Sequence, residues 1–195
     1  MECGSGARSV GAAWRLRTYA AFAINFVLLV AGAIAADPQR TEYQIKAAFL
    51  CKFGNFVDWP STAASAPQGL PFTIGVVASD AVVDELIRAA ASQTVGGRPI
   101  TVRRFARDDS VAGLSILYVA THTDRIAQAL ASAKGHPVLT VTESERGTSV
   151  GSMVNFVIVD DKVKFDIAIE AAEQSGLKIS ARLLSVARAV IGRNV

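Results

Sequence analysis

One stretch of the sequence matches a catalytic pattern. Residues 147–151, Gly-Thr-Ser-Val-Gly, fit the G-x-S-x-G motif that carries the nucleophilic serine of many hydrolases. That motif needs a strand before the serine, a helix after it and a histidine further along the chain. Here a strand pattern follows Ser149, and both histidines, His122 and His136, precede it. We interpret the motif as a loop and predict no catalytic residue; labelling of Ser149 by a fluorophosphonate would revive the hydrolase alternative.

The residue types give little indication of a metal site, a cofactor site or a nucleic-acid partner. The chain has 2 histidines and 2 cysteines, and no cysteine lies near either histidine, which leaves almost no material for a zinc site. No glycine-rich phosphate-binding motif occurs. The formal net charge of +3 is too small to indicate a nucleic-acid partner. We therefore predict no metal, no cofactor and no nucleic-acid partner.

The N-terminal residues 1–35 have the layout of a secretory signal peptide. A leader with three arginines precedes an uncharged apolar run over residues 20–34, and small residues at Ala33 and Ala35 form a cleavage site before Ala36. The run is shorter than the roughly 18–20 residues that cross a bilayer. We expect cleavage between Ala35 and Ala36 and export to the periplasm; the alternative is an uncleaved N-terminal anchor.

Cleavage would leave Cys51 as the one cysteine of the mature chain, which could then form no intrachain disulfide. Cys51 lies in a predicted helix that Pro60 ends, roughly opposite the apolar face that carries Ile45 and Phe53. Small residues such as Ala47 share its side of the helix. Two interpretations stay open: both faces are buried within one domain, or this face contacts a partner or a second copy, where the thiol could join two chains.

The remaining residues alternate between predicted strands and helices. Apolar, β-prone runs at residues 72–78, 99–105, 114–120 and 138–142 predict strands, and the segments 80–91 and 123–133 between them predict helices. This order favours a mostly parallel sheet covered by helices.

The pattern changes after Gly151. Two β-prone runs at residues 153–159 and 163–169 flank an acidic turn and predict an antiparallel hairpin. The last part, ending in residues 180–191, has a helical pattern. We therefore predict an α/β fold, a mostly parallel sheet flanked by helices with a C-terminal antiparallel hairpin and a terminal helix, in one domain over residues 36–195.

Three stretches together resemble one known family. They are IKAAFLCKF at 45–53 with FVDWP at 56–60, then GSMVNFV at 151–157 with KVKFDI at 162–167, and finally Ala171-Ala172, GLKIS at 176–180 and Leu183-Leu184. In this order they are similar to the YfiR/HmsC-like family of exported bacterial proteins. The central strands are generic and add nothing to the resemblance.

The resemblance implies a periplasmic regulator and not an enzyme. Such proteins bind the periplasmic part of an inner-membrane diguanylate cyclase and hold it inactive, which lowers cyclic di-GMP and biofilm formation. An outer-membrane OmpA-like lipoprotein is a second partner that the resemblance allows, and a homodimer stays open. Some relatives carry several cysteines in disulfides, so redox control through an intrachain bond does not transfer to this chain. The alternative is a periplasmic small-molecule binding module, with its ligand at the ends of parallel strands.

Four residues near the family-like ends of the chain are the expected contacts to the partner: Trp59, Lys178, Arg182 and Arg188. Trp59 closes an aromatic cluster where the first helix ends, and the three cations lie beside the apolar stripe of the predicted last helix. Tryptophan and arginine are over-represented among residues that dominate binding energy. The alternative is that the arginines are merely solvated. Phe53 is expected to be a core residue.

Overall fold

The computed structural model describes residues 38–60, 70–120, 123–144, 148 and 151–192. The predicted signal peptide over residues 1–35, its cleavage site at Ala35 and Ala36, and Ser149 and His122 lie outside these residues. Within the described part of the chain, no helix is both long and apolar enough to cross a membrane.

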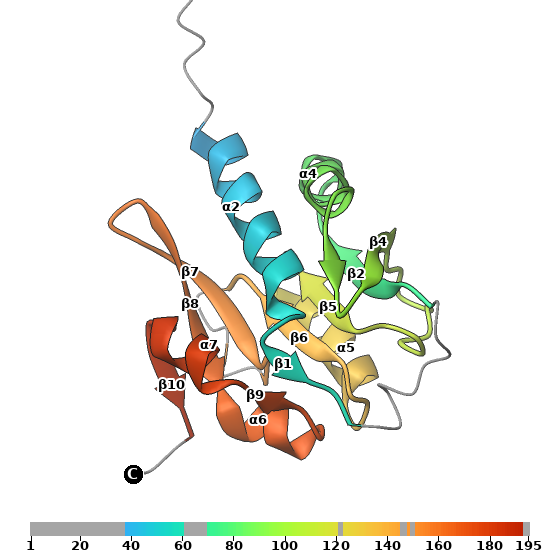
Figure 1. Ribbon diagram of the computed structural model, residues 1–195, viewed down its shortest axis with the longest axis vertical. Coiled ribbons are helices and arrows are strands. Elements are labelled where there is room, and N and C mark those ends of the chain that lie inside the picture. Colours follow the sequence, from blue (N-terminus) through green and yellow to red (C-terminus); the bar gives the residue numbers. More distant parts are fainter. Residues whose placement is uncertain (1–37, 61–69, 121–122, 145–147, 149–150, 193–195) are drawn as a thin grey trace, which may run out of the picture. The chain divides into compact units, whose positions relative to one another are not determined.

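A mixed sheet forms the centre of the fold (Figure 1). In spatial order its strands are β10 (Ala189–Ile191), β8 (Lys162–Ala168), β7 (Val154–Val159), β6 (Leu139–Thr142), β5 (Ile116–Val119), β2 (Phe72–Val77), β4 (Arg98–Arg104) and β3 (Thr94–Val95). Neighbours run parallel except in the pairs β7–β8 and β3–β4. Every residue of β5 and β6 is buried, as expected of parallel strands covered on both faces. The predicted α/β architecture is confirmed.

Helices cover both faces of this sheet (Figure 1). The helices α2 (Pro38–Phe53) and α4 (Asp80–Ala90) pack on the face to which Ile116 and Tyr118 of β5 point. The helix α5 (Thr123–Ala133) packs on the opposite face, against Leu117 and Val119. Successive residues of β5 thus supply two separate cores, because side chains alternate between the faces of a strand.

The hairpin β7–β8 forms as predicted. Val159 pairs with Lys162, so Asp160 and Asp161 make a two-residue turn. Both aspartates have a positive φ, 50° and 57°, which is the conformation of the type I′ turns that match the twist of two antiparallel strands. Aspartate tolerates this left-handed region better than most residues.

The C-terminal segment differs from the prediction. It contains α6 (Ile169–Gln174), β9 (Lys178–Ile179), α7 (Ala181–Val186) and β10. The helix begins where expected, since the Ser180 hydroxyl caps it by accepting the backbone N–H of Leu183 at 3.3 Å. It ends at Val186, however, and Ala187 turns extended, with ψ 147°. The predicted helical end at Ile191 is wrong, because the backbone there pairs with β8 instead.

Candidate partner-binding surface

A small second sheet brings the first and last family-like stretches together. The strand β1 (Val57–Asp58) pairs antiparallel with β9, so that Asp58 lies opposite Lys178. The backbone N–H of Ser180 extends this contact by donating to the carbonyl of Phe56 at 2.9 Å. Two of the residues expected to bind a partner, Trp59 and Lys178, therefore lie next to the same two-stranded sheet.

Trp59 is half-buried and mainly a packing residue. Its indole meets the ring of Phe72 edge-on, with 5.4 Å between the ring centroids and 86° between the planes. Its Nε1 is buried and has no hydrogen-bond partner among the described residues. The side chain thus stabilises the junction between β1 and β2, and only part of it is available to another protein.

Lys178 and Arg182 are exposed and form no ion pair with any described residue. Arg182 lies one helical turn before Val186, whose side chain is 61 % exposed. Val190 and Ile191, on the edge strand β10, are 37 % and 44 % exposed, and as successive residues of a strand they point to opposite faces. We call the group formed by Lys178, Arg182 and Val186, on the consecutive elements β9 and α7, the tail surface. Exposed apolar side chains beside unpaired cations are typical of surfaces that bind other proteins.

Arg188 has a partner inside the molecule. Its Nε donates to Oδ1 of Asp166 at 2.7 Å and its Nη2 donates to Oδ2, which makes a bidentate ion pair. The hydrogen bond and the charge of Asp166 raise the pKa of Arg188 above its usual value. Asp166 is buried, with 6 % exposure, so the guanidinium compensates a carboxylate that the sheet has removed from water. Arg188 thus has a structural role as the counter-charge of Asp166, whereas Arg182 has no such role.

The end of α2 is buried on both faces. Phe53 is 1 % exposed and contacts the rings of Phe156 and Phe165, at centroid distances of 5.9 and 5.3 Å. It is a core residue, as expected. Cys51, on the other side of the helix, is fully buried, and burial raises the pKa of its thiol to about 11. The folded domain therefore presents no thiolate to a second chain, which favours the single-domain interpretation. Ile45, expected on the buried face, is 40 % exposed.

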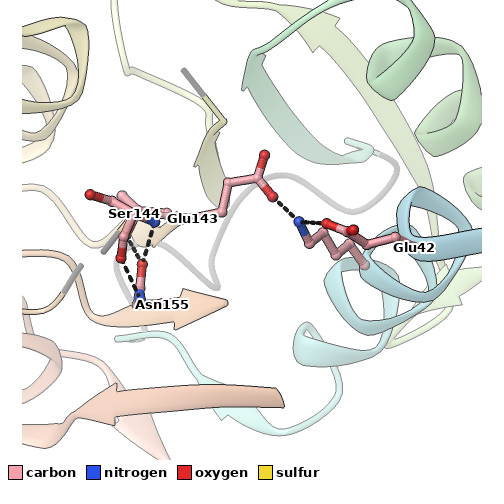
Figure 2. A network of polar contacts seen from close by, with 6 residues as sticks. Glu42, Glu143, Ser144 and Asn155 are labelled. Atoms are coloured by element: carbon pink, nitrogen blue, oxygen red, sulfur yellow. Dashed lines mark hydrogen bonds and ion pairs between the residues drawn. The ribbon is translucent and has the colours of Figure 1, made fainter. Parts of the chain in front are cut away.

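A partly buried ion-pair network joins α2 to the sheet (Figure 2). Lys46 is 5 % exposed, and its ammonium group contacts Glu42 at 2.5 Å and also Glu143, which follows β6. Burial lowers the pKa of Lys46, but the hydrogen bonds and charges of Glu143 and Glu42 outweigh this effect and raise it above the usual value. Burial, followed by the Glu143 charge, also raises the pKa of the neighbouring Tyr118 phenol. Sequence analysis missed this network, because it assigned no role to Glu42, Lys46 or Glu143.

Asn155 holds the segment that carries Glu143 (Figure 2). Its Oδ1 accepts from Thr142 Oγ1 at 2.8 Å and from the Ser144 N–H at 3.0 Å, and its Nδ2 donates to the Ser144 carbonyl at 3.0 Å. Lys46 and Asn155 come from the first and second family-like stretches. The polar residues of these stretches therefore position α2 on the sheet. The stretch at 45–53 carries two lysines, and only Lys46 is buried, so residue types alone could not show which of them forms an ion pair.

Two solved structures resemble the chain at low identity. One is the ABC domain in complex with L-Trp from Streptococcus pneumonia, with 14 % identity, a TM-score of 0.48 and coverage of 62 % of this chain and 55 % of that chain. The other is a conserved domain protein from Vibrio cholerae O1 biovar eltor str. N16961, with 14 % identity, a TM-score of 0.47 and coverage of 64 % and 56 %. The chain spans little more than half the length of either protein, and neither likeness bears on function.

The sequence itself matches the YfiR/HmsC-like family over residues 43–188. The match includes all three stretches on which the resemblance depends. It also spans the elements from Tyr43 within α2 to the end of α7, including the two-stranded sheet and the ion pair between Lys46 and Glu143. The chain belongs to the YfiR/HmsC-like family.

Proposed function

We propose that this chain is exported to the periplasm and represses an inner-membrane diguanylate cyclase by binding its periplasmic part. The YfiR/HmsC-like family consists of periplasmic regulatory proteins that act in the context of diguanylate cyclases, and this membership is the observation that carries the proposal. To this general role we add a specific mechanism, repression by direct binding.

The tail surface supports this proposal as the place of contact. Arg182 and Lys178 supply two cations without intramolecular ion pairs among the described residues, and Val186 supplies the most exposed large apolar side chain. A partner that fits would offer an apolar patch bordered by carboxylates. An arginine at the edge of an apolar contact is a common anchor of binding energy, because it buries a large area and keeps its charge hydrogen-bonded.

Repression of this kind is a shift between two populations of the cyclase. A regulator that binds only the inactive form multiplies the ratio of inactive to active cyclase by the factor 1 + [regulator]/Kd. At a free concentration of about one hundred times Kd, that ratio rises about a hundredfold. The regulator needs no catalytic residue for this effect, only a difference in affinity between the two forms of its partner.

Deletion of the gene tests the proposal. We expect cellular cyclic di-GMP and surface attachment to rise in a deletion strain in which the cyclase is expressed, and to return to normal when the wild-type chain is restored. Complementation with Arg182→Glu should fail, whereas complementation with Arg40→Glu, an exposed charge reversal on α2, should succeed. Unchanged cyclic di-GMP in the deletion strain, with the cyclase shown to be present, would refute repression.

Two further measurements identify the compartment and the partner. Mass spectrometry of the exported protein should give a mature N-terminus at Ala36, and an N-terminus at Met1 would contradict export with cleavage. Pull-down of the exported chain from solubilised membranes should recover a diguanylate cyclase. The same experiment tests for an OmpA-like lipoprotein, and size-exclusion chromatography with light scattering tests for a homodimer.

A further inference from the structure

A pocket separate from the tail surface lies at the carboxyl ends of β2 and β4, beside α5. It is a pocket of about 320 Å³. Apolar residues form part of its lining, among them Val77, Phe105 and Ala129. The cations at the pocket are Arg104, Arg107 and Arg125. Small-molecule sites typically combine such an apolar lining with a few convergent polar groups.

The charge at this pocket is only partly neutralised inside the molecule. Arg104 pairs with Asp80 at 2.6 Å. Arg107 and Arg125 form no ion pair or hydrogen bond with any described residue, and they come from separate elements, the loop after β4 and the first turns of α5. Asp108 follows Arg107 directly in the sequence and forms no ion pair with it, and Asp109 accepts the backbone N–H of Ala106 at 2.9 Å. Two guanidinium groups at one pocket thus remain available to an anion.

The position in the sheet is one that favours ligand binding. β2 and β5 are neighbours, and the chain leaves β2 through α4 towards β4 but leaves β5 through α5 towards β6. The two helices pack on opposite faces of the sheet, as the two separate cores show. The connections therefore diverge between β2 and β5, and in open α/β sheets such a divergence leaves a crevice at the carboxyl ends of the strands. The pocket lies beside this point.

We propose that this pocket binds a small organic anion, whose carboxylate or phosphate group pairs with Arg107 and Arg125 while its apolar body packs on Phe105. Planar guanidinium groups pair with both kinds of anion through two parallel hydrogen bonds. The volume suits a molecule of small-metabolite size and is too small for a folded partner. Because α7 leads into β10, which lies towards the other end of the sheet from β2 and β4, such a ligand leaves the tail surface uncovered.

Titration of the purified chain with four probes, followed by ¹H–¹⁵N NMR at about 150 mM salt, tests the proposal. Phenyl phosphate and benzoate carry both an anionic group and an apolar body, inorganic phosphate carries only charge, and benzyl alcohol carries only the body. We expect saturable shifts at the amides of Phe105, Arg107 and Ala129 with phenyl phosphate or benzoate. Inorganic phosphate and benzyl alcohol should each bind at least tenfold more weakly.

Matched variants separate the pocket from general charge effects. Arg107→Gln and Arg125→Gln should each weaken binding of the better probe at least tenfold without lowering the melting temperature. Arg40→Gln makes the same charge change on α2, on the other face of the sheet, and should leave affinity within twofold of the wild type. Three results would overturn the proposal: no saturable shift with any of the four probes, equal binding by the Arg125→Gln chain, or equal loss of binding in Arg40→Gln. Cyclic di-GMP levels do not enter this test, so it is independent of the repression proposed above.

Discussion

Arg188 and Asp166 form a bidentate ion pair that fastens the edge strand β10 to β8. The two partners differ in exposure, with 46 % for the arginine side chain and 8 % for the aspartate. Loss of Arg188 and loss of Asp166 should therefore lower the stability of the fold by different amounts. Without Arg188 a buried carboxylate lacks its counter-charge, whereas without Asp166 the guanidinium can still be solvated.

We accordingly expect Arg188→Gln to lower the melting temperature by several degrees and Asp166→Ala to lower it less. Thermal unfolding followed by circular dichroism measures both. Arg182→Gln is the matched control, because Arg182 is exposed without an ion pair and its loss should change the free energy of unfolding by less than about 0.5 kcal/mol. If Arg188→Gln unfolds at the wild-type temperature, the pair does not stabilise β10.

The Lys46 network should stabilise the position of α2. Lys46→Ala leaves the Glu42 and Glu143 carboxylates close together without a counter-charge. Breaking a fully buried pair costs roughly 3–5 kcal/mol, and we expect roughly 2–3 kcal/mol of unfolding free energy here because the carboxylates keep partial exposure. Urea unfolding measures the change.

A double-mutant cycle provides the control for this network. Adding Glu143→Gln to Lys46→Ala should recover part of the lost stability, because it removes one of the two unpaired carboxylates. Lys52→Ala, an exposed change on the same helix, should have an effect below about 0.5 kcal/mol. Equal losses for Lys46→Ala and Lys52→Ala would show that the network contributes nothing.

Cys51 predicts a loss of stability at alkaline pH. The unfolded thiol ionises near its usual pKa of 9.0, whereas the folded thiol has a pKa of about 11. Between these two pH values the folded thiol keeps its proton while the unfolded thiol has lost it. The contribution of Cys51 to the free energy of unfolding is therefore complete below pH 9.0 and declines as pH rises to about 11. The decline amounts to about 3 kcal/mol.

Comparison with Cys51→Ala isolates this contribution. The difference in unfolding free energy between wild type and variant should shrink by about 3 kcal/mol as pH rises over that interval, since other titrating groups are common to both chains. Iodoacetamide should also leave the folded thiol unmodified at pH 8 and label it in urea. Rapid labelling of the native chain would contradict the burial of Cys51.

Phe53 and Arg182 should separate stability from binding. Phe53→Ala removes a ring that packs among three others, and it should cost roughly 3–5 kcal/mol of unfolding free energy. Arg182→Glu should leave the melting temperature unchanged and weaken partner affinity by roughly 2 kcal/mol or more, the effect expected at a binding hot spot. Calorimetric unfolding and titration with the cyclase's periplasmic part measure the two effects. Normal binding by Arg182→Glu would remove α7 from the proposed interface.

The elements that local patterns could predict are those whose residues show one dominant periodicity. The apolar runs of β2, β5 and β6 and the presence of a tight acidic turn after Val159 were visible in this way, although the strand after the turn begins at Lys162 and not at Val163. The end of the chain was not. Leu183, Leu184 and Ala187 fit a helical stripe, and nothing local signals that the backbone after Val186 pairs with β8, because that pairing depends on a strand elsewhere in the chain.

The candidate site shows the same division. Trp59, Lys178 and Arg182 were chosen from their residue types. The structure brings the first two to one small sheet, which no sequence pattern could reveal because its strands β1 and β9 have only two residues each. The partners of Lys46 and Arg188 were missed for a related reason. The ion pair between Lys46 and Glu143 joins two elements that are far apart in the sequence. A single sequence does not show which distant residues come into contact.

The pairing of β10 with β8 and of β9 with β1 also determines when the domain can finish folding. β9 and β10 come after every other described strand in the chain, so they are the last of these strands to be synthesised. Until they arrive, β8 presents an unpaired edge and β1 has no partner. An open strand edge is a template for pairing with other chains. A nascent or truncated chain that ends at Gln174 is therefore the form most prone to aggregation, and a chaperone would have to shield the β8 edge until β10 closes it.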